Sequence, residues 1–202
     1  MKKDTDRFFV LTGGPGSGKS TLADALRRAG YVTSIEAGRS IIQDQTAIGG
    51  QALPWQAPML FAEMMLWLDM RSYRMAQEQT GPVFFDRGIV DTIGYVRLSA
   101  LPVPKYMENA VELFRYNTRV FISPPWREIF QPDGERKQDF QEAVRTYEVM
   151  VETYTEYNYE LVELPRVSVE QRTRFVLDQV SEMQLRSLKG GEQGPLAKMK
   201  AE

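Results

Sequence analysis

The chain has 202 residues, 43% of them hydrophobic and 26% charged, and its 25 basic and 27 acidic residues leave a formal net charge of −2. These values are typical of one globular domain and provide no strong positive field for long nucleic acids. The absence of cysteine and histidine excludes disulfides, Cys/His zinc sites, thiol nucleophiles and imidazole bases. Acid/base chemistry must therefore use carboxylates, lysine or tyrosine, and a bound metal must be a hard ion such as Mg²⁺.

Short apolar segments alternate with helical patterns along the chain. Strands are expected at 7–12, 31–36, 83–86, 118–123 and 159–164. Helices are expected over about 22–29, 37–46, 59–79, 89–98, 105–115, 140–154 and 168–188. This alternation predicts an α/β fold in which a parallel sheet carries helices on both faces.

The helix expected over 59–79 is rich in apolar residues. Those at three- and four-residue spacing predict its buried stripe, which comprises Leu60, Met64, Trp67, Leu68 and Met75. Trp67 matches this stripe, so we expect it in the core. Trp55 lies in the preceding loop, and we expect it to form a wall of a pocket, where it would stack on the ring of a ligand.

A glycine-rich segment follows the first expected strand and fits the pattern G-x-x-x-x-G-K-[S/T] at every fixed position. It comprises Gly13, Gly14, Pro15, Gly16, Ser17, Gly18, Lys19 and Ser20, with Thr21 next. Glycines let backbone amides wrap an anion, and the following helix adds the positive end of its dipole. Lys19 would reach the β- and γ-phosphates and the Ser20 hydroxyl would bind Mg²⁺. The segment therefore predicts a nucleotide triphosphate site.

The strand at 83–86 ends in Asp86, which is suitably placed to hold Mg²⁺ directly or through water. Arg87 follows where motor-type ATPases usually carry a glutamate, and the chain has no N-K-x-D guanine motif. Asp-Arg at a strand end resembles the motif of nucleoside and nucleotide kinases in which the acid serves metal or base chemistry and the arginine holds the acceptor. A purely structural ion pair remains the alternative.

Further candidates flank these motifs. Glu36, at the end of the second strand, would accept the proton of a substrate hydroxyl, and Arg39 would grip a phosphate or carboxylate of the acceptor. A capping glutamate with a solvated arginine is equally compatible with the sequence. Asp91 would either orient a polar group of the substrate or cap a helix.

The segment at about 124–137 is charged and rich in loop-forming residues. It is expected either to cover the phosphates as a lid or to remain a solvated loop. Its cations are Arg127, Arg136 and Lys137. Arg136 is the preferred catalytic arginine because positive charge on a cover neutralises the transferring phosphoryl group.

Three spaced segments, E-A-x-R, F-F-D-R-G-x-x-D and P-P-W…E-R-K, extend these motifs. With them, residues of about 7–182 resemble the AAA_28 family of small P-loop ATPase or kinase-like domains. That family is similar to the ribosylnicotinamide kinase domain of bacterial NAD regulators. The resemblance implies a P-loop NTPase three-layer sandwich, a five-stranded parallel sheet in the order 2-3-1-4-5 and a lid at about 124–137.

Residues 1–188 are expected to form a single domain and 189–202 a flexible tail. The sequence shows no membrane span or signal peptide, so we expect a cytoplasmic monomer or homodimer.

The leading hypothesis is an ATP- and Mg²⁺-dependent phosphotransferase acting on a small metabolite such as a nucleoside rather than on nucleic acid. The expected catalytic residues are Lys19, Glu36, Asp86 and Arg136. The acceptor would meet Glu36, Arg39, Arg87 and Asp91, and the metal Ser20 and Asp86. The alternatives are an ATP hydrolase or nucleotide-dependent switch acting on a protein partner, a noncatalytic nucleotide-binding module, and a polynucleotide kinase.

Overall fold

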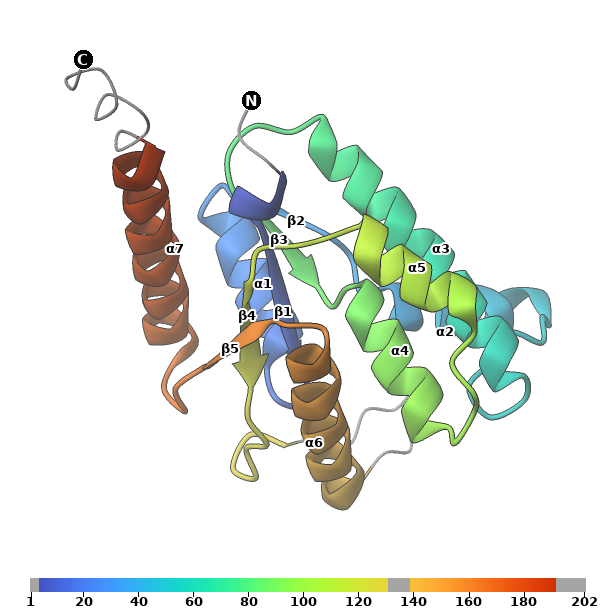
Figure 1. Ribbon diagram of the computed structural model, residues 1–202. Helices are drawn as coiled ribbons and strands as arrows, with labels where there is room; N and C mark the ends of the chain where they lie inside the picture. The colour runs from blue at the N-terminus through green and yellow to red at the C-terminus, as the bar shows by residue number, and fades with distance from the viewer. Residues whose placement is uncertain (1–3, 131–138, 192–202) are drawn as a thin grey trace, which may run out of the picture.

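The computed structural model describes residues 4–130 and 139–191, in which helices cover both sides of a central sheet (Figure 1). The strands are β1 (Phe8–Gly13), β2 (Val32–Thr33), β3 (Val83–Asp86), β4 (Arg119–Ser123) and β5 (Glu160–Glu163). The first turn is the 3₁₀ helix η1 (Asp4–Asp6), and the α-helices are α1 (Lys19–Arg28), α2 (Ala37–Ile48), α3 (Pro58–Gln77), α4 (Ile89–Leu98), α5 (Lys105–Leu113), α6 (Phe140–Glu156) and α7 (Val169–Gly191). Across the described ranges, no helix has both the length and the apolarity needed to cross a membrane.

The sheet is parallel throughout, and its strand order is β2-β3-β1-β4-β5. This order confirms the topology that the family resemblance implied. In the register of the sheet, Leu11 of β1 lies beside Asp86 of β3 and Phe121 of β4. The carboxyl ends of the three central strands therefore lie side by side, and in open parallel sheets such an edge is where ligands bind.

Apolar side chains cover both faces of the sheet. On one face, Phe8 and Val10 join a core with residues of α3, α4 and α6. On the other, Phe9 and Leu11 pack with residues of α1 and α7. Figure 1 shows the same division, with α1 and α7 on one side and α3 to α6 on the other. The result is the three-layer α/β sandwich of the P-loop type, with β1 buried in its centre.

The second strand is shorter than expected, because β2 covers only Val32–Thr33 of the segment 31–36. The next residue, Ser34, still donates its backbone N–H to the carbonyl oxygen of Phe84 at 2.8 Å. Its side-chain oxygen accepts the Asp86 N–H at 3.0 Å in place of a backbone carbonyl. The backbone ladder thus ends at Ser34, and the chain is free to turn toward Glu36.

The buried face of α3 differs from the expected stripe. Trp67 is 57% exposed and lies beneath the guanidinium of Arg71, whose carbon is 5.7 Å from the ring centroid. The expectation that Trp67 lies in the core was therefore wrong, and Leu60 and Met75 are exposed as well. The buried residues are Phe61, Ala62, Met65, Leu66, Asp69, Tyr73 and Ala76. Apolar residues occur on nearly every side of this helix, so their spacing alone does not select the buried face.

Two expected segments extend beyond the described residues. Of the lid expected at about 124–137, residues 131–138 lie outside them. The tail expected at 189–202 begins inside α7, which continues to Gly191, and residues 192–202 lie outside the described part.

Candidate active site

The glycine-rich segment joins the carboxyl end of β1 to the start of α1, as the motif predicted. Gly18 is the N-cap of α1 and has a φ of 78°, a left-handed conformation that favours glycine. At Gly14, an added Cβ would meet the backbone carbonyl of Ala143 on α6. α6 therefore packs against the loop at Gly14, and the N-terminus of α1 provides the backbone amides and dipole that favour phosphate.

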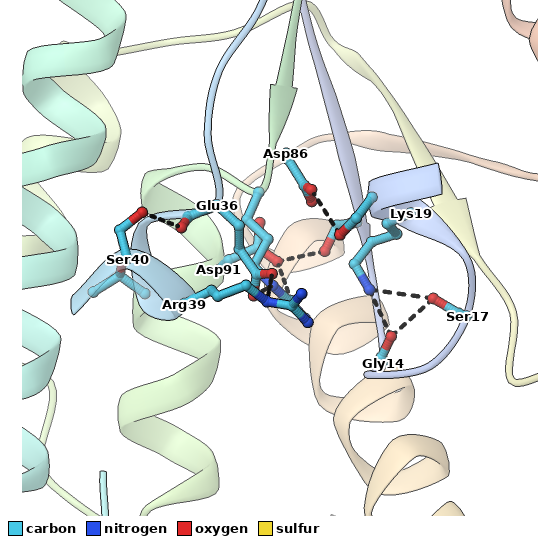
Figure 2. Close-up of polar contacts among 12 residues, drawn as sticks. Gly14, Ser17, Lys19, Glu36, Arg39, Ser40, Asp86 and Asp91 are labelled. Atoms are coloured by element: carbon cyan, nitrogen blue, oxygen red, sulfur yellow. Dashed lines mark hydrogen bonds and ion pairs between the residues drawn. The ribbon is translucent and has the colours of Figure 1, made fainter. Parts of the chain in front are cut away.

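The Lys19 side chain curls back over this loop. Its ammonium donates to the carbonyl oxygen of Gly14 at 2.6 Å and to the Ser17 hydroxyl at 3.2 Å (Figure 2). Burial lowers the pKa of Lys19 to about 7, and the positive charge of Arg87 acts in the same direction. The cation expected to meet the phosphates thus lies at the centre of the phosphate-binding loop.

Asp86 and Ser20 meet across the β1–β3 edge, where the Ser20 hydroxyl donates to Asp86 Oδ2 at 3.2 Å. The other carboxylate oxygen, Oδ1, is buried and has no hydrogen-bond partner among the described residues. Burial raises the pKa of Asp86, and the negative charge of Glu36 adds to the effect. A cation would compensate both effects, so the pair fits a hard divalent ion such as Mg²⁺.

Arg87 links two carboxylates that come from different elements. Its Nε donates to Glu36 Oε1 at 3.2 Å and its Nη1 to Asp91 Oδ1 at 3.1 Å. Burial favours a lower pKa for Arg87, but Glu36 and Asp91 outweigh it and raise the pKa above the usual value. The predicted Asp-Arg motif therefore forms a buried network with Glu36, in which the Arg87 guanidinium stays charged.

Asp91 is the most extensively bonded carboxylate of this network. Besides Arg87, it accepts the hydroxyl of Thr12 at 2.6 Å, the hydroxyl of Tyr154 at 2.6 Å and the backbone N–H of Gly88 at 3.0 Å. The last of these bonds caps the N-terminus of α4. The sequence left two roles open for Asp91, orienting a polar group of the substrate or capping a helix. The structure shows that Asp91 caps α4 and pairs with Arg87.

Glu36 stands immediately before α2 as its N-cap residue, and its backbone carbonyl accepts the Ser40 hydroxyl (Figure 2). Glu36 is only 8% exposed. Arg39 lies one turn later, with its Nε 3.9 Å from Glu36 Oε2 and its side chain 43% exposed. The two residues are thus neighbours, as the spacing predicted, but the closer ion pair of Glu36 is with Arg87.

The expected lid cations are only partly visible. Arg136 and Lys137 lie outside the described residues. Arg127 is described, and the carbon of its guanidinium lies 4.2 Å from the ring centroid of Phe140 at the start of α6.

A cavity of about 720 Å³ adjoins the glycine-rich loop. The residues that line it include Pro15 of the loop together with Glu36, Arg87 and Asp91. Its apolar walls come from the loop before α3 and from α2, α3, α4 and α6, and they include Ile42, Trp55, Phe61, Met65, Tyr95 and Met150. The expectation that Trp55 forms a pocket wall is confirmed. Cavities of this size and composition suit small-molecule ligands.

Two polar residues near the site, Asp69 and Arg172, were not predicted from the sequence. Asp69 lines the cavity from the buried face of α3 and accepts the Thr92 hydroxyl at 3.3 Å. The four-residue spacing of Phe61, Met65 and Asp69 could have indicated that Asp69 lies on the buried face of α3. The predicted apolar stripe lay on another face of this helix, so the spacing did not identify it. Arg172 of α7 has Nη1 3.4 Å from the carbonyl oxygen of Ser17, and nothing in the sequence indicated this contact.

Comparison with known proteins identifies the family of the chain. The model of the AAA_28 family, described as an AAA domain, matches residues 8–172, so the chain belongs to that family. No curated protein matches the sequence significantly.

Three solved structures share the fold. Deoxyadenosine kinase from M. mycoides has a TM-score of 0.65 at 12% identity, and the match covers 87% of this chain and 99% of that one. The NadR protein in complex with NR has a TM-score of 0.62 at 20% identity, with 89% and 52% covered. Thymidylate kinase from Ehrlichia chaffeensis has a TM-score of 0.58 at 17% identity, with 86% and 98% covered. Two of the three are named as kinases, and at these identities the likeness shows the fold alone.

Proposed function

We propose that this chain is a Mg²⁺-dependent phosphotransferase that moves the γ-phosphoryl group of ATP to a hydroxyl group of a small metabolite. The observation that carries this proposal is that the glycine-rich loop borders the cavity: Pro15 of the loop lines it together with Glu36, Arg87 and Asp91. Phosphoryl transfer needs donor and acceptor held side by side, and catalysis then depends on positioning and electrostatics. The kinase fold of the structural relatives agrees with this chemistry.

The donor site would be the segment from Gly13 to Thr21. Its amides and the Lys19 ammonium would hold the phosphates, while Ser20 and Asp86 would hold Mg²⁺ through their oxygens. When bound, Mg²⁺ would neutralise the charge on the phosphate oxygens.

Glu36 would be the general base. It lines the cavity, whereas Asp86, the other candidate, is not among the residues that line it and pairs with the Ser20 hydroxyl instead. Glu36 would take the proton from the attacking hydroxyl, and Arg87 would hold the carboxylate in a fixed direction. A base that is fixed before the substrate binds loses little freedom during the reaction.

The remaining cations would act on the acceptor and on the transferred group. Arg87 lines the cavity, and Arg39 lies beside Glu36 and follows Gly38, a lining residue on α2. Arg136 is the proposed catalytic arginine of a lid at about 124–137. Among the residues that the structure describes, Arg145 of α6 is exposed and lines the cavity. It would help to neutralise the charge of the transferred phosphoryl group.

The proposal is tested by incubating the protein with γ-labelled ATP, Mg²⁺ and pools of small metabolites, followed by chromatography. We expect label in a metabolite, and we expect Glu36→Gln to reduce transfer by about 10²- to 10⁴-fold while ATP binding persists. Asp86→Asn is expected to raise the Mg²⁺ concentration that transfer requires. The matched control is Asp24→Asn, which removes an exposed carboxylate paired with Arg27 and should keep the wild-type rate.

Two outcomes would overturn the assignment. Release of free phosphate at the wild-type rate with no labelled metabolite would support the hydrolase alternative instead. Binding of ATP without phosphate release or transfer would support a noncatalytic nucleotide-binding module.

A further inference from the structure

The buried carboxyl of Asp69 is an unusual feature of the cavity wall. Asp69 is 7% exposed, belongs to the apolar face of α3 and lines the cavity beside Phe61 and Met65. Its hydrogen-bond partner in the described chain is the Thr92 hydroxyl, which donates to Oδ2 at 3.3 Å. A buried carboxyl with one such bond retains acceptor capacity, and a donor proton if it is protonated. It is therefore equipped to bind a polar group of a ligand.

The groups around Asp69 do not supply a neutralising cation. Within the described ranges Asp69 forms no ion pair, and the nearby Arg87 is already bonded to Glu36 and Asp91. Three polar side chains that line the cavity with Asp69 come from α4: the Asp91 carboxylate, the Thr92 hydroxyl and Tyr95. Glu36 comes from the turn before α2, and the Tyr116 hydroxyl also interacts electrostatically with Asp69. Burial raises the pKa of Asp69 to about 8, and the negative charge of Asp91 adds to the effect. The neutral acid is therefore the main form at pH 7.

We propose that Asp69 determines acceptor specificity by donating a hydrogen bond from its neutral carboxylic acid to a carbonyl oxygen or unprotonated ring nitrogen of the acceptor. The acceptor class is an uncharged heterocycle that carries a hydroxyl group elsewhere. Trp55, Phe61 and Tyr95 line the same cavity and provide aromatic surface for such a ring. An anionic ring substituent would be disfavoured, because it would be desolvated near the carboxylates of Asp91 and Glu36.

Because this inference rests on the proposed function, ligand binding is measured apart from phosphoryl transfer. The probes are adenosine and cytidine, whose rings are uncharged between about pH 6.5 and 9, and the method is calorimetric titration without ATP. At about pH 6.5 we expect Asp69→Asn, which keeps a polar donor, to bind at least one probe within about threefold of wild type. Asp69→Leu, which keeps the branched shape but not the donor, should weaken binding by about tenfold. If binding follows this order but no label is transferred, only the proposed function fails.

The pH dependence separates the neutral acid from an ionised one. With a pKa of about 8, about a tenth of Asp69 retains its proton at pH 9, so wild-type binding should weaken by up to about tenfold from pH 6.5 to 9. Asp69→Asn has no such proton and should bind equally at both pH values. This comparison remains valid even if Asp69→Leu fails to fold.

Two results would overturn the inference. The first is a wild-type affinity independent of pH together with equal binding by the Asn and Leu variants. The second is tighter binding of a permanently cationic pyridinium nucleoside than of adenosine and cytidine at about pH 6.5, lost in Asp69→Asn, because Asp69 would then act as a carboxylate at a pH where the inference requires the neutral acid.

Discussion

Removing the Asp91 carboxylate tests whether the network beneath the cavity stabilises the fold. Asp91 is 5% exposed and accepts hydrogen bonds from Thr12, Arg87, Gly88 and Tyr154 at 2.6 to 3.1 Å. In an Asp91→Ala variant, all four donors lose this acceptor, and of the two ion pairs of Arg87 among the described residues the one with Glu36 remains. The variant therefore removes a charge and leaves its buried partners unsatisfied.

The expected loss is a large part of the total stability. Removing one member of a buried ion pair costs about 3–5 kcal/mol, whereas whole domains are stable by about 5–15 kcal/mol. For Asp91→Asn, which keeps the shape and one acceptor oxygen, we expect a loss of about 1.5–3 kcal/mol, the value of one charge-assisted hydrogen bond. Tyr154→Phe should cost about 1–2 kcal/mol in the wild type and less in Asp91→Asn, because the hydroxyl then no longer donates to a charged acceptor.

These values are measured by urea unfolding followed by far-UV circular dichroism at pH 7.5. The matched control is Asp24→Asn, whose exposed pair with Arg27 should contribute less than about 0.5 kcal/mol. If Asp91→Asn loses no more stability than Asp24→Asn, the network does not stabilise the fold. If the costs of Tyr154→Phe and Asp91→Asn simply add, the two residues are not coupled.

Three further predictions concern other parts of the site. Burial raises the pKa of Asp69 to about 8, so between about pH 4 and pH 8 the folded state keeps a proton that the unfolded state has lost. Stability should therefore fall as pH rises through this range, and Asp69→Asn should reduce the fall, as urea unfolding at pH 5 and pH 8 would show. Lys19→Ala should reduce phosphoryl transfer by about 10²- to 10³-fold in a steady-state assay, because the transition state loses its buried cation. Gly14→Ala should destabilise the fold by about 1–3 kcal/mol in thermal unfolding, because its Cβ would meet the backbone carbonyl of Ala143.

The central strands could be predicted because their sequences are apolar on both faces. β1, β3 and β4 lie between two helical layers, so their buried residues form continuous runs that end at glycine, aspartate or serine. β2 could not be bounded in the same way, because Val32 is 39% exposed and the Ser34 side chain replaces a backbone acceptor. The buried face of α3 could not be predicted either, because tertiary contacts and not the spacing of apolar residues select it.

In the candidate site as well, residues of contiguous motifs could be predicted, whereas contacts between residues distant in the sequence could not. The glycine-rich loop, Ser20 and Asp86 belong to contiguous motifs whose chemistry requires those residue types, so they could be predicted from the sequence. Two partners of Asp91, Thr12 and Tyr154, did not follow from any local pattern. Thr12 is 79 positions away and Tyr154 is 63 positions away, and only the packing of α4 against β1 and α6 brings them together.

Arg87 shows how the requirements of the site override local backbone preference. Its φ is 70°, a left-handed conformation that costs a side-chain-bearing residue about 1–2 kcal/mol relative to glycine. Its backbone N–H nevertheless continues toward β1, donating to the carbonyl oxygen of Leu11 at 3.0 Å. Two charge-assisted bonds, to Glu36 and Asp91, are each worth more than an ordinary hydrogen bond and offset the strain. The backbone of Arg87 is thus fixed by β1 and its side chain by Asp91, so the arginine can hold the proposed general base, Glu36, in one direction.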